Sequence, residues 1–474
     1  MKNSNSRLRF FFFALFFLFF LTFVGTIKAF LLVVFCYGAG LFLFTSLGLP
    51  EVLFSLLLFT LPFEKGLRDW IVPVVPPGPE LWAPGYSFYF GITLKLILAY
   101  GALALLALSR NARLPSNKKA LFMLFLFFLL AAASTIASSE GAISFMGLLR
   151  LLQGGIIFLL GSYFFQKSPT MRNYAETLFV AFLFFFGFIG LLQYFSGQPL
   201  GLFLEDSLGV RAFGYITSDT GPLYRVSGLL GHPTFFGTFL SLLLPVSVAL
   251  WIEKQKNNRP DPLSVFLPTT IFVGFTATIA TLSRSAWLAL AVCVPFFLWK
   301  LHVDHLQRLT KAFWIAMIVG ALFASVLFGQ TLMTRASTFT DLASLSSGRI
   351  RLDLIEQTGM IVRESPLFGT GLNLFTRAMN VHDLPPELKG FMYPVHNTFL
   401  LFFSELGIPA GLLFIIFVGY CLFSSWEKAK RRWVSFGFWL GAWTFVVNAQ
   451  FHTLFNQDPT LDLFLVFLGY LSAV

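Results

Sequence analysis

Residues 11–26 read FFFALFFLFFLTFVGT and follow the basic residues Lys2, Arg7 and Arg9. An apolar run of this length between basic and polar flanks predicts a helix that enters a membrane. It could also be a secretory signal peptide, but no small-residue cleavage site follows it. We therefore interpret this stretch as a retained first membrane span.

Comparable apolar runs recur along the whole chain, which has 474 residues, 57% of them hydrophobic and only 12% charged. Runs of about 18 or more apolar residues are typical of membrane helices. We therefore predict an all-α, polytopic integral membrane protein with about 14 (12–14) transmembrane helices, forming a single domain over residues 1–474. The predicted spans are centred near residues 17, 38, 57, 98, 128, 154, 184, 242, 273, 292, 320, 408, 441 and 466.

The net charge of +11 is distributed as a topology signal rather than as a binding patch for nucleic acid. With the spans above, every basic cluster lands on the side of the N-terminus, which the positive-inside rule makes the cytoplasm. We expect no nucleic-acid partner. The cysteines Cys36, Cys293 and Cys421 all lie inside apolar runs, which argues against a disulfide or a zinc site.

Three long segments then face the opposite, extracytoplasmic side: residues 64–88, 195–232 and a large loop at 329–396. Within the large loop, GRIRLDLIEQTGMIVRES (residues 348–365) has apolar residues at helical spacing and predicts an amphipathic helix. The following PLFGTGLNLF (residues 366–375) predicts a turn.

Arg225 and Arg284 lie in connections on the outer side, where basic residues are normally scarce. Arg225 is part of LYRVSGLLGHPTFFG (residues 223–237), just before a span, and Arg284 is part of TLSRSAW (residues 281–287), in a hairpin with almost no loop. A guanidinium stays charged and donates hydrogen bonds in a planar fork that suits a diphosphate. The alternatives are a solvated loop arginine for Arg225 and an arginine that reaches lipid phosphates for Arg284.

His396, in YPVHNTFLLFFSELG (residues 393–407), lies where the large loop enters the next span. Near pH 7 an imidazole is the side chain best suited to accept a proton from an attacking hydroxyl. A lone histidine at a helix start is also often only an interfacial polar residue. His232 and His452 lie on the same predicted side and compete for the role.

Ionisable residues inside predicted spans are further candidates, because charges in membranes are costly and often functional. Lys95 and Arg150 lie in the outer halves of their predicted helices. Glu405 follows His396 by nine residues, roughly 13 Å further along a straight helix. A structural ion pair is the alternative for each, while an outward-facing polar cavity would make them substrate ligands together with Arg349 and Asn397.

Residues 200–410 resemble the O-antigen ligase and polymerase superfamily of bacterial membrane glycosyltransferases. The matching features are Arg225 with Leu229, Arg284 within SRS, Gly348-Arg349 leading into PLFGTGLNLF, and His396 with Gly407. Each feature is weak alone, but their order and spacing together are fairly specific. About fourteen spans exceeds the twelve usual for lipopolysaccharide ligases, which leaves the acceptor open.

The resemblance implies transfer of a glycan from a polyprenyl diphosphate carrier to an acceptor sugar hydroxyl, without metal or cofactor and with inversion. Arg225 and Arg284 would hold the diphosphate, with Arg349 as a helper, and His396 would orient or deprotonate the acceptor. The expected partners are the lipid-linked oligosaccharide, a glycan or lipid A core-like acceptor and membrane lipids. The expected location is the bacterial inner membrane, with a cytoplasmic N-terminus and a periplasmic site.

Three functions are compatible with the sequence. An O-antigen ligase is slightly preferred over a polymerase of O-antigen or exopolysaccharide. A transporter or flippase for lipid-linked sugars would instead show inverted repeats, broken helices and charges near mid-membrane. The sequence has no visible repeat, and its charges are biased outward.

Overall fold

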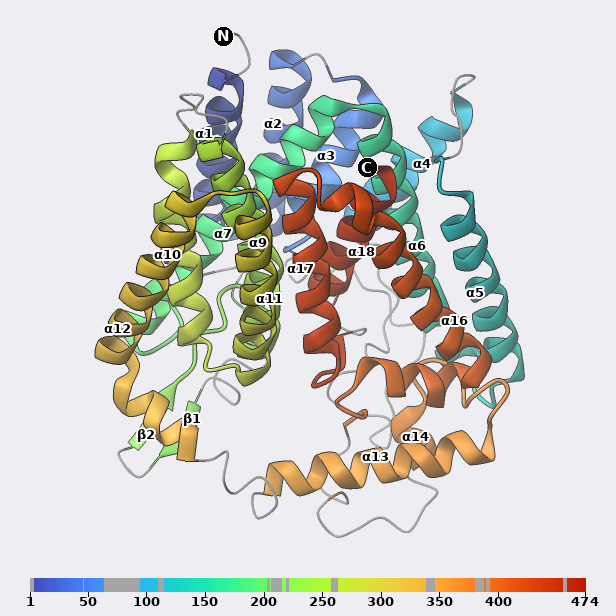
Figure 1. The fold of residues 1–474 in the computed structure, drawn as a ribbon. Coiled ribbons are helices and arrows are strands. Elements are labelled where there is room, and N and C mark those ends of the chain that lie inside the picture. Colours follow the sequence, from blue (N-terminus) through green and yellow to red (C-terminus); the bar gives the residue numbers. More distant parts are fainter. Residues whose placement is uncertain are drawn as a thin grey trace.

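The protein is a bundle of helices with the N-terminus at one end and a long helix, α13, lying across the other end (Figure 1). The computed structural model describes residues 4–45, 47–63, 94–109, 115–202, 205, 215–218, 221–256, 263–337, 346–379, 388, 393–454 and 458–474. The predicted outer segment 64–88 lies outside these described residues.

The helices of the first half are α1 (Ser4–Leu21), α2 (Ile27–Phe44), α3 (Leu49–Thr60), α4 (Leu94–Leu108), α5 (Lys118–Ala137), α6 (Gly141–Lys167) and α7 (Pro169–Ser196). After the hairpin β1 (Tyr215–Ser218) and β2 (Gly221–Tyr224) come α9 (Pro233–Lys256), α10 (Leu263–Ala280), α11 (Arg284–Val303), α12 (Gln307–Ser337), α13 (Ser346–Glu364), α14 (Phe375–Met379), α16 (Thr398–Ala429), α17 (Trp433–Ala449) and α18 (Asp458–Ala473).

The helical fold class is confirmed, and the chain is a multi-pass membrane protein. Each of the fourteen predicted span centres falls within a helix. Within the described residues, eight helices are long and apolar enough to cross a membrane, so the count of about fourteen stays a prediction. The sequence did not predict the antiparallel hairpin, in which Tyr215 pairs with Tyr224 and Ser218 with Gly221.

The boundaries of α7 show how local chemistry defines these helices. Ser168 is the N-cap, and its hydroxyl accepts a hydrogen bond from the Met171 amide while Pro169 occupies the first turn. Proline is tolerated there because the first amides of a helix have no intrahelical partner. Gly197 ends the helix in the left-handed conformation (φ 64°), which glycine adopts without steric cost.

The helices α9 and α17 pack closely because glycine replaces larger residues on one face of α17. A Cβ added to Gly437 would lie 2.7 Å from the Pro245 carbonyl oxygen, and one added to Gly441 would lie 2.5 Å from that of Leu242. Small residues four apart let two membrane helices approach to backbone contact. This packing sets where the segment after α17 lies relative to the start of α9.

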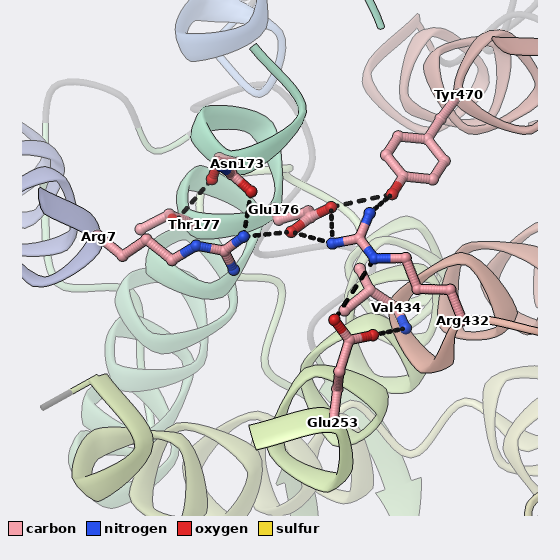
Figure 2. Close-up of polar contacts among 8 residues, drawn as sticks. All are labelled: Arg7, Asn173, Glu176, Thr177, Glu253, Arg432, Val434 and Tyr470. Carbon is pink, nitrogen blue, oxygen red and sulfur yellow. Dashed lines mark hydrogen bonds and ion pairs between the residues drawn. The ribbon is translucent and has the colours of Figure 1, made fainter. Parts of the chain in front are cut away.

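At the end that carries the N-terminus, a buried carboxylate ties several helices together (Figure 2). Glu176 of α7 is fully buried and pairs with Arg7 of α1 at 3.2 Å and with Arg432 at 3.0 Å. The Tyr470 hydroxyl of α18 donates to the same carboxylate at 2.9 Å, and Arg432 also reaches Glu253 of α9 at 3.4 Å. Two guanidinium groups and a phenol thus compensate one buried charge, as a buried anion requires.

The predicted amphipathic helix is confirmed as α13, and the predicted turn follows it. The turn packs against a break in α16 at Gly407, which has φ 84°. The Gly371 amide donates to the Glu405 carbonyl at 2.9 Å, and the Ile408 amide donates to the Pro366 carbonyl at 2.8 Å. The backbone groups that the break removes from the helix are therefore satisfied by the turn. The break follows Glu405 in the chain, so the predicted depth of Glu405 relative to His396 stays a prediction.

Candidate active site

Arg225 is held beside the turn between α10 and α11. Its Nε donates to the Thr281 carbonyl at 3.0 Å, and the next amide, that of Val226, donates to the Ala280 carbonyl at 3.4 Å. The Gln193 side chain of α7 holds the segment that follows Arg225. Its Oε1 accepts a hydrogen bond from the Gly228 amide at 2.8 Å, and its Nε2 donates one to the Gly228 carbonyl at 2.9 Å. Arg225 therefore lies next to the connection that carries Arg284.

Arg284 is the first residue of α11 and is placed by a three-residue turn. Leu282 adopts a positive φ of 52°, and the Ser283 amide donates to the Thr281 hydroxyl at 3.2 Å. The Thr281 hydroxyl in turn donates to the Thr278 carbonyl at 2.7 Å. Such a short, hydrogen-bonded turn keeps the guanidinium at the helix ends, with its Nη1 atom buried.

His396 lies just before α16 and is partly buried. The pKa of its imidazole is lowered to about 4, first by burial and then by the positive charge of Arg351, while a hydrogen bond with the Pro394 backbone acts in the opposite direction. The ring is therefore neutral at pH 7. A neutral imidazole is the protonation state that can accept a proton.

The neighbouring Asn397 serves the backbone. Its Oδ1 caps α16 by accepting from the Phe399 and Leu400 amides, both at 3.0 Å. Its Nδ2 donates to the Gln450 side chain at 3.2 Å. Both the oxygen and the nitrogen of the Asn397 amide are therefore used in contacts within the protein. Substrate binding by Asn397 stays a prediction, and helix capping is its alternative role.

His452, in the segment after α17, shows that the distant stretches of chain converge. Its Nε2 is 3.0 Å from the Ser285 hydroxyl, next to Arg284. Burial lowers the pKa of this histidine well below its ordinary value, and four charged or titratable neighbours lower it further. In decreasing order of effect, these neighbours are Arg351, His396, His232 and Arg225.

Arg351 joins this group, although the sequence pattern pointed to Arg349. Arg349 is exposed on α13, whereas Arg351 is partly buried, and its pKa is lowered by burial and by the charge of Arg284. Residues two apart on a helix point to nearly opposite sides, because each residue turns about 100°. Helical spacing in the sequence could have indicated Arg351. It lies three residues before Leu354 and seven before Thr358, which are both buried, so the three residues share one face of α13.

We call Arg225, Arg284, Arg351, His396 and His452 the cationic cluster. It combines three permanent positive charges with two imidazoles that are neutral at pH 7. Like charges brought together out of bulk water repel one another, so the arrangement is costly without a counter-charge. The three guanidinium groups of the cluster are suited to bind an anion with several oxygens.

Two of the three remaining predicted substrate ligands, Lys95 and Glu405, have other contacts. Lys95 forms a 2.8 Å ion pair with Asp462, and both side chains are buried, with 1% and 5% exposed. Glu405 accepts from the Phe375 amide at the start of α14, at 3.3 Å. Arg150 is partly buried on α6. Substrate binding by these residues stays a prediction. For Lys95, the ion pair with Asp462 corresponds to the alternative of a structural role.

Metal ligands are not grouped in the part of the chain that the structure describes, where no three His, Cys, Asp or Glu side chains are placed to share an ion. Independence from metal ions stays a prediction.

Comparison with known families identifies the central part of the chain. Residues 269–415 match the family described as O-antigen ligase. Over these residues the chain is similar to the O-antigen ligase and polymerase superfamily. This superfamily consists of membrane glycosyltransferase-like enzymes that use lipid-linked glycans and acceptors in general. Curated proteins give no match to the chain.

The O-antigen ligase region contains Arg284, Arg351 and His396, so most of the cationic cluster lies within it. Arg225 and His452 come from outside the matched residues and reach the cluster through the contacts described above. The match supports the predicted resemblance to the superfamily over residues 269–410, and the extension of the core region to residue 200 stays a prediction.

Proposed function

We propose that this protein transfers a glycan from a polyprenyl diphosphate carrier to a sugar hydroxyl of an acceptor, with inversion and without a metal ion. The observation that carries the proposal is the convergence of Arg225, Arg284 and Arg351 with the neutral imidazole of His396. Cations that bind a diphosphate and a base that accepts a proton are the two groups that this reaction requires.

The arginines hold the diphosphate and stabilise its departure. When the bond between the anomeric carbon and the phosphate oxygen breaks, its electron pair leaves with the diphosphate, and negative charge grows there. Positive groups fixed at that place stabilise the transition state more than the ground state. Arg351 takes the helper role that the sequence pattern gave to Arg349, because Arg351 is the one that interacts with Arg284.

His396 acts on the acceptor. The acceptor oxygen attacks the anomeric carbon from the face opposite the diphosphate, and its proton passes to the imidazole as the new glycosidic bond forms. An imidazole with a pKa of about 4 is a weak base, but it is available in neutral form. Bound diphosphate brings negative charge to the cluster, which raises the basicity of His396 at the moment when it is needed.

The proposed setting is the inner membrane of a bacterium, with a cytoplasmic N-terminus and the cationic cluster at the periplasmic face. The end remote from the N-terminus carries α13 and the β1–β2 hairpin (Figure 1). We slightly prefer a ligase, acting on a lipid A core-like or other glycan acceptor, over a polymerase that extends a second carrier-linked chain. Both use the same donor chemistry.

Transport of a lipid-linked sugar is the weaker candidate, although α16 is broken as some transporter helices are. In transporters, the backbone groups at such a break bind the substrate or a coupling ion. Here the groups around Gly407 pair with Pro366 and Gly371 instead. The backbone groups at the break are therefore used by the turn between α13 and α14.

The test is an assay of the purified chain in nanodiscs with an undecaprenyl diphosphate oligosaccharide and a panel of glycan and lipid A core acceptors. Product masses distinguish ligation, chain growth and the absence of chemistry. Arg284→Ala and His396→Ala should abolish transfer and leave the melting temperature near that of the wild type. Transfer at the wild-type rate by both variants would remove the basis of the proposal.

A further inference from the structure

The segment Gln450–Leu454, between α17 and α18, connects the two helix starts that carry the proposed catalytic groups. The Thr398 hydroxyl, at the start of α16, donates to the His452 carbonyl at 2.8 Å and accepts from the Leu454 amide at 3.0 Å. The Asn397 amide also donates to Gln450 at 3.2 Å. The backbone of this segment is therefore fixed to the residues that follow His396.

The His452 ring extends from this fixed backbone to the other helix start. Its Nε2 lies 3.0 Å from the Ser285 hydroxyl, which lies 3.2 Å from the Ser283 hydroxyl. Ser285 follows Arg284 directly, in the first turn of α11. One histidine thus connects the backbone beside His396 to the helix turn that carries Arg284.

The first turn of α11 lacks a side-chain cap hydrogen bond from its N-cap residue. Ser283 occupies the N-cap position, where a serine hydroxyl normally accepts a hydrogen bond from an amide of the first turn. Here its side chain makes no such cap bond. The hydroxyl lies near Ser285 instead, so the side-chain contacts at this end lead from Ser283 through Ser285 to His452.

We propose that His452 is a positioning residue of the diphosphate site. Its hydrogen bond with Ser285 holds the Arg284 guanidinium in place relative to the His396 imidazole. The inference rests on the proposed function and adds a residue from outside the O-antigen ligase region (residues 269–415). In this role His452 acts through Arg284 and does not itself touch the substrate.

The charges around His452 give the role a second observable. The groups that face its ring are Arg225 and His232 from the segment before α9, Arg351 from α13 and His396 from the segment before α16. Burial, the larger cause, and these groups together disfavour the protonated ring. A bound diphosphate offsets their charge, so its binding should be accompanied by proton uptake at mildly acid pH.

The test measures binding of undecaprenyl diphosphate to the full chain in nanodiscs by calorimetry at pH 7. Ser285→Ala and His452→Ala should each weaken binding about tenfold, which corresponds to about 1.4 kcal/mol. His452→Gln retains a side-chain amide that can reach Ser285, so it should bind nearly as the wild type does. The matched control is His302→Gln, an exposed residue near the opposite end of α11, which should change nothing.

Proton uptake separates positioning from a purely structural role. Binding enthalpies at pH 6, measured in buffers of different ionisation enthalpy, give the number of protons taken up. The wild type should take up more protons than His452→Gln, because the amide cannot titrate. Equal uptake by both proteins would show that His452 does not respond to the bound anion and would overturn this part of the inference.

The outcomes also separate this inference from the proposed function. If Arg284→Ala loses binding while Ser285→Ala and His452→Ala bind as the wild type does, the positioning role is wrong and the proposed function stands. If the wild type does not bind undecaprenyl diphosphate, the proposed function fails first. Should His452→Ala lose its folded structure, Ser285→Ala decides the question, since it removes a single oxygen atom.

Discussion

Replacing Arg351 by glutamine should raise the pKa of His396. In the folded protein this pKa is about 4, against 6.5 for an ordinary histidine, and Arg351 is the second cause after burial. A unit charge several ångströms away, at an effective dielectric constant of about 20, contributes on the order of 1–2 kcal/mol, or about one pKa unit. We therefore expect the pKa to rise to about 5, because the protonated ring is no longer repelled by the guanidinium.

This shift can be measured without any substrate. The chain has six histidines, so selective ¹³C labelling of the imidazole gives six resonances, and His396→Gln identifies the one of interest. At pH 5 about a tenth of the His396 side chains should be protonated in the wild type and about half in Arg351→Gln. The matched control is Arg349→Gln, which removes the same charge from the exposed side of α13.

Two results would contradict the electrostatic account of the cluster. A wild-type His396 that titrates near 6.5 would mean that the ring is neither buried nor close to a cation. An equal shift in Arg349→Gln and Arg351→Gln would mean that the general charge of α13, rather than the inward arginine, sets the pKa.

The remaining predictions concern stability and metal dependence. Glu176→Ala should lower the free energy of unfolding by about 3 kcal/mol, because it leaves Arg7 and Arg432 without their shared buried carboxylate; an unchanged melting temperature would refute this. Lys95→Met should lower the melting temperature because it leaves the buried Asp462 carboxylate without its positive partner. The double variant Lys95→Met/Asp462→Leu should recover most of the lost melting temperature. Glycan transfer should continue in EDTA because arginines supply the positive charge, and strict dependence on a divalent ion in the same assay would rule the mechanism out.

Several parts of the fold could be predicted from the sequence because they depend on local patterns. Long apolar runs predict helices wherever backbone groups must be satisfied without water. The spacing within residues 348–365 predicted α13, and the short connection around Arg284 predicted a tight turn at a helix end. Charge bias placed Arg225, Arg284 and His396 on one side, and the structure brings them into one electrostatic group.

Partners that are distant along the chain were decided only by tertiary packing. Lys95 and Asp462 are separated by 367 positions, and no local pattern pairs them. The contact of His452 with Ser285 likewise joins residues that are 167 positions apart. The sequence by itself determined which segments are helical and which chemical groups stand at their ends. Only the packed bundle decided which of those groups meet, because helices of similar hydrophobicity leave many arrangements open until their side chains interlock.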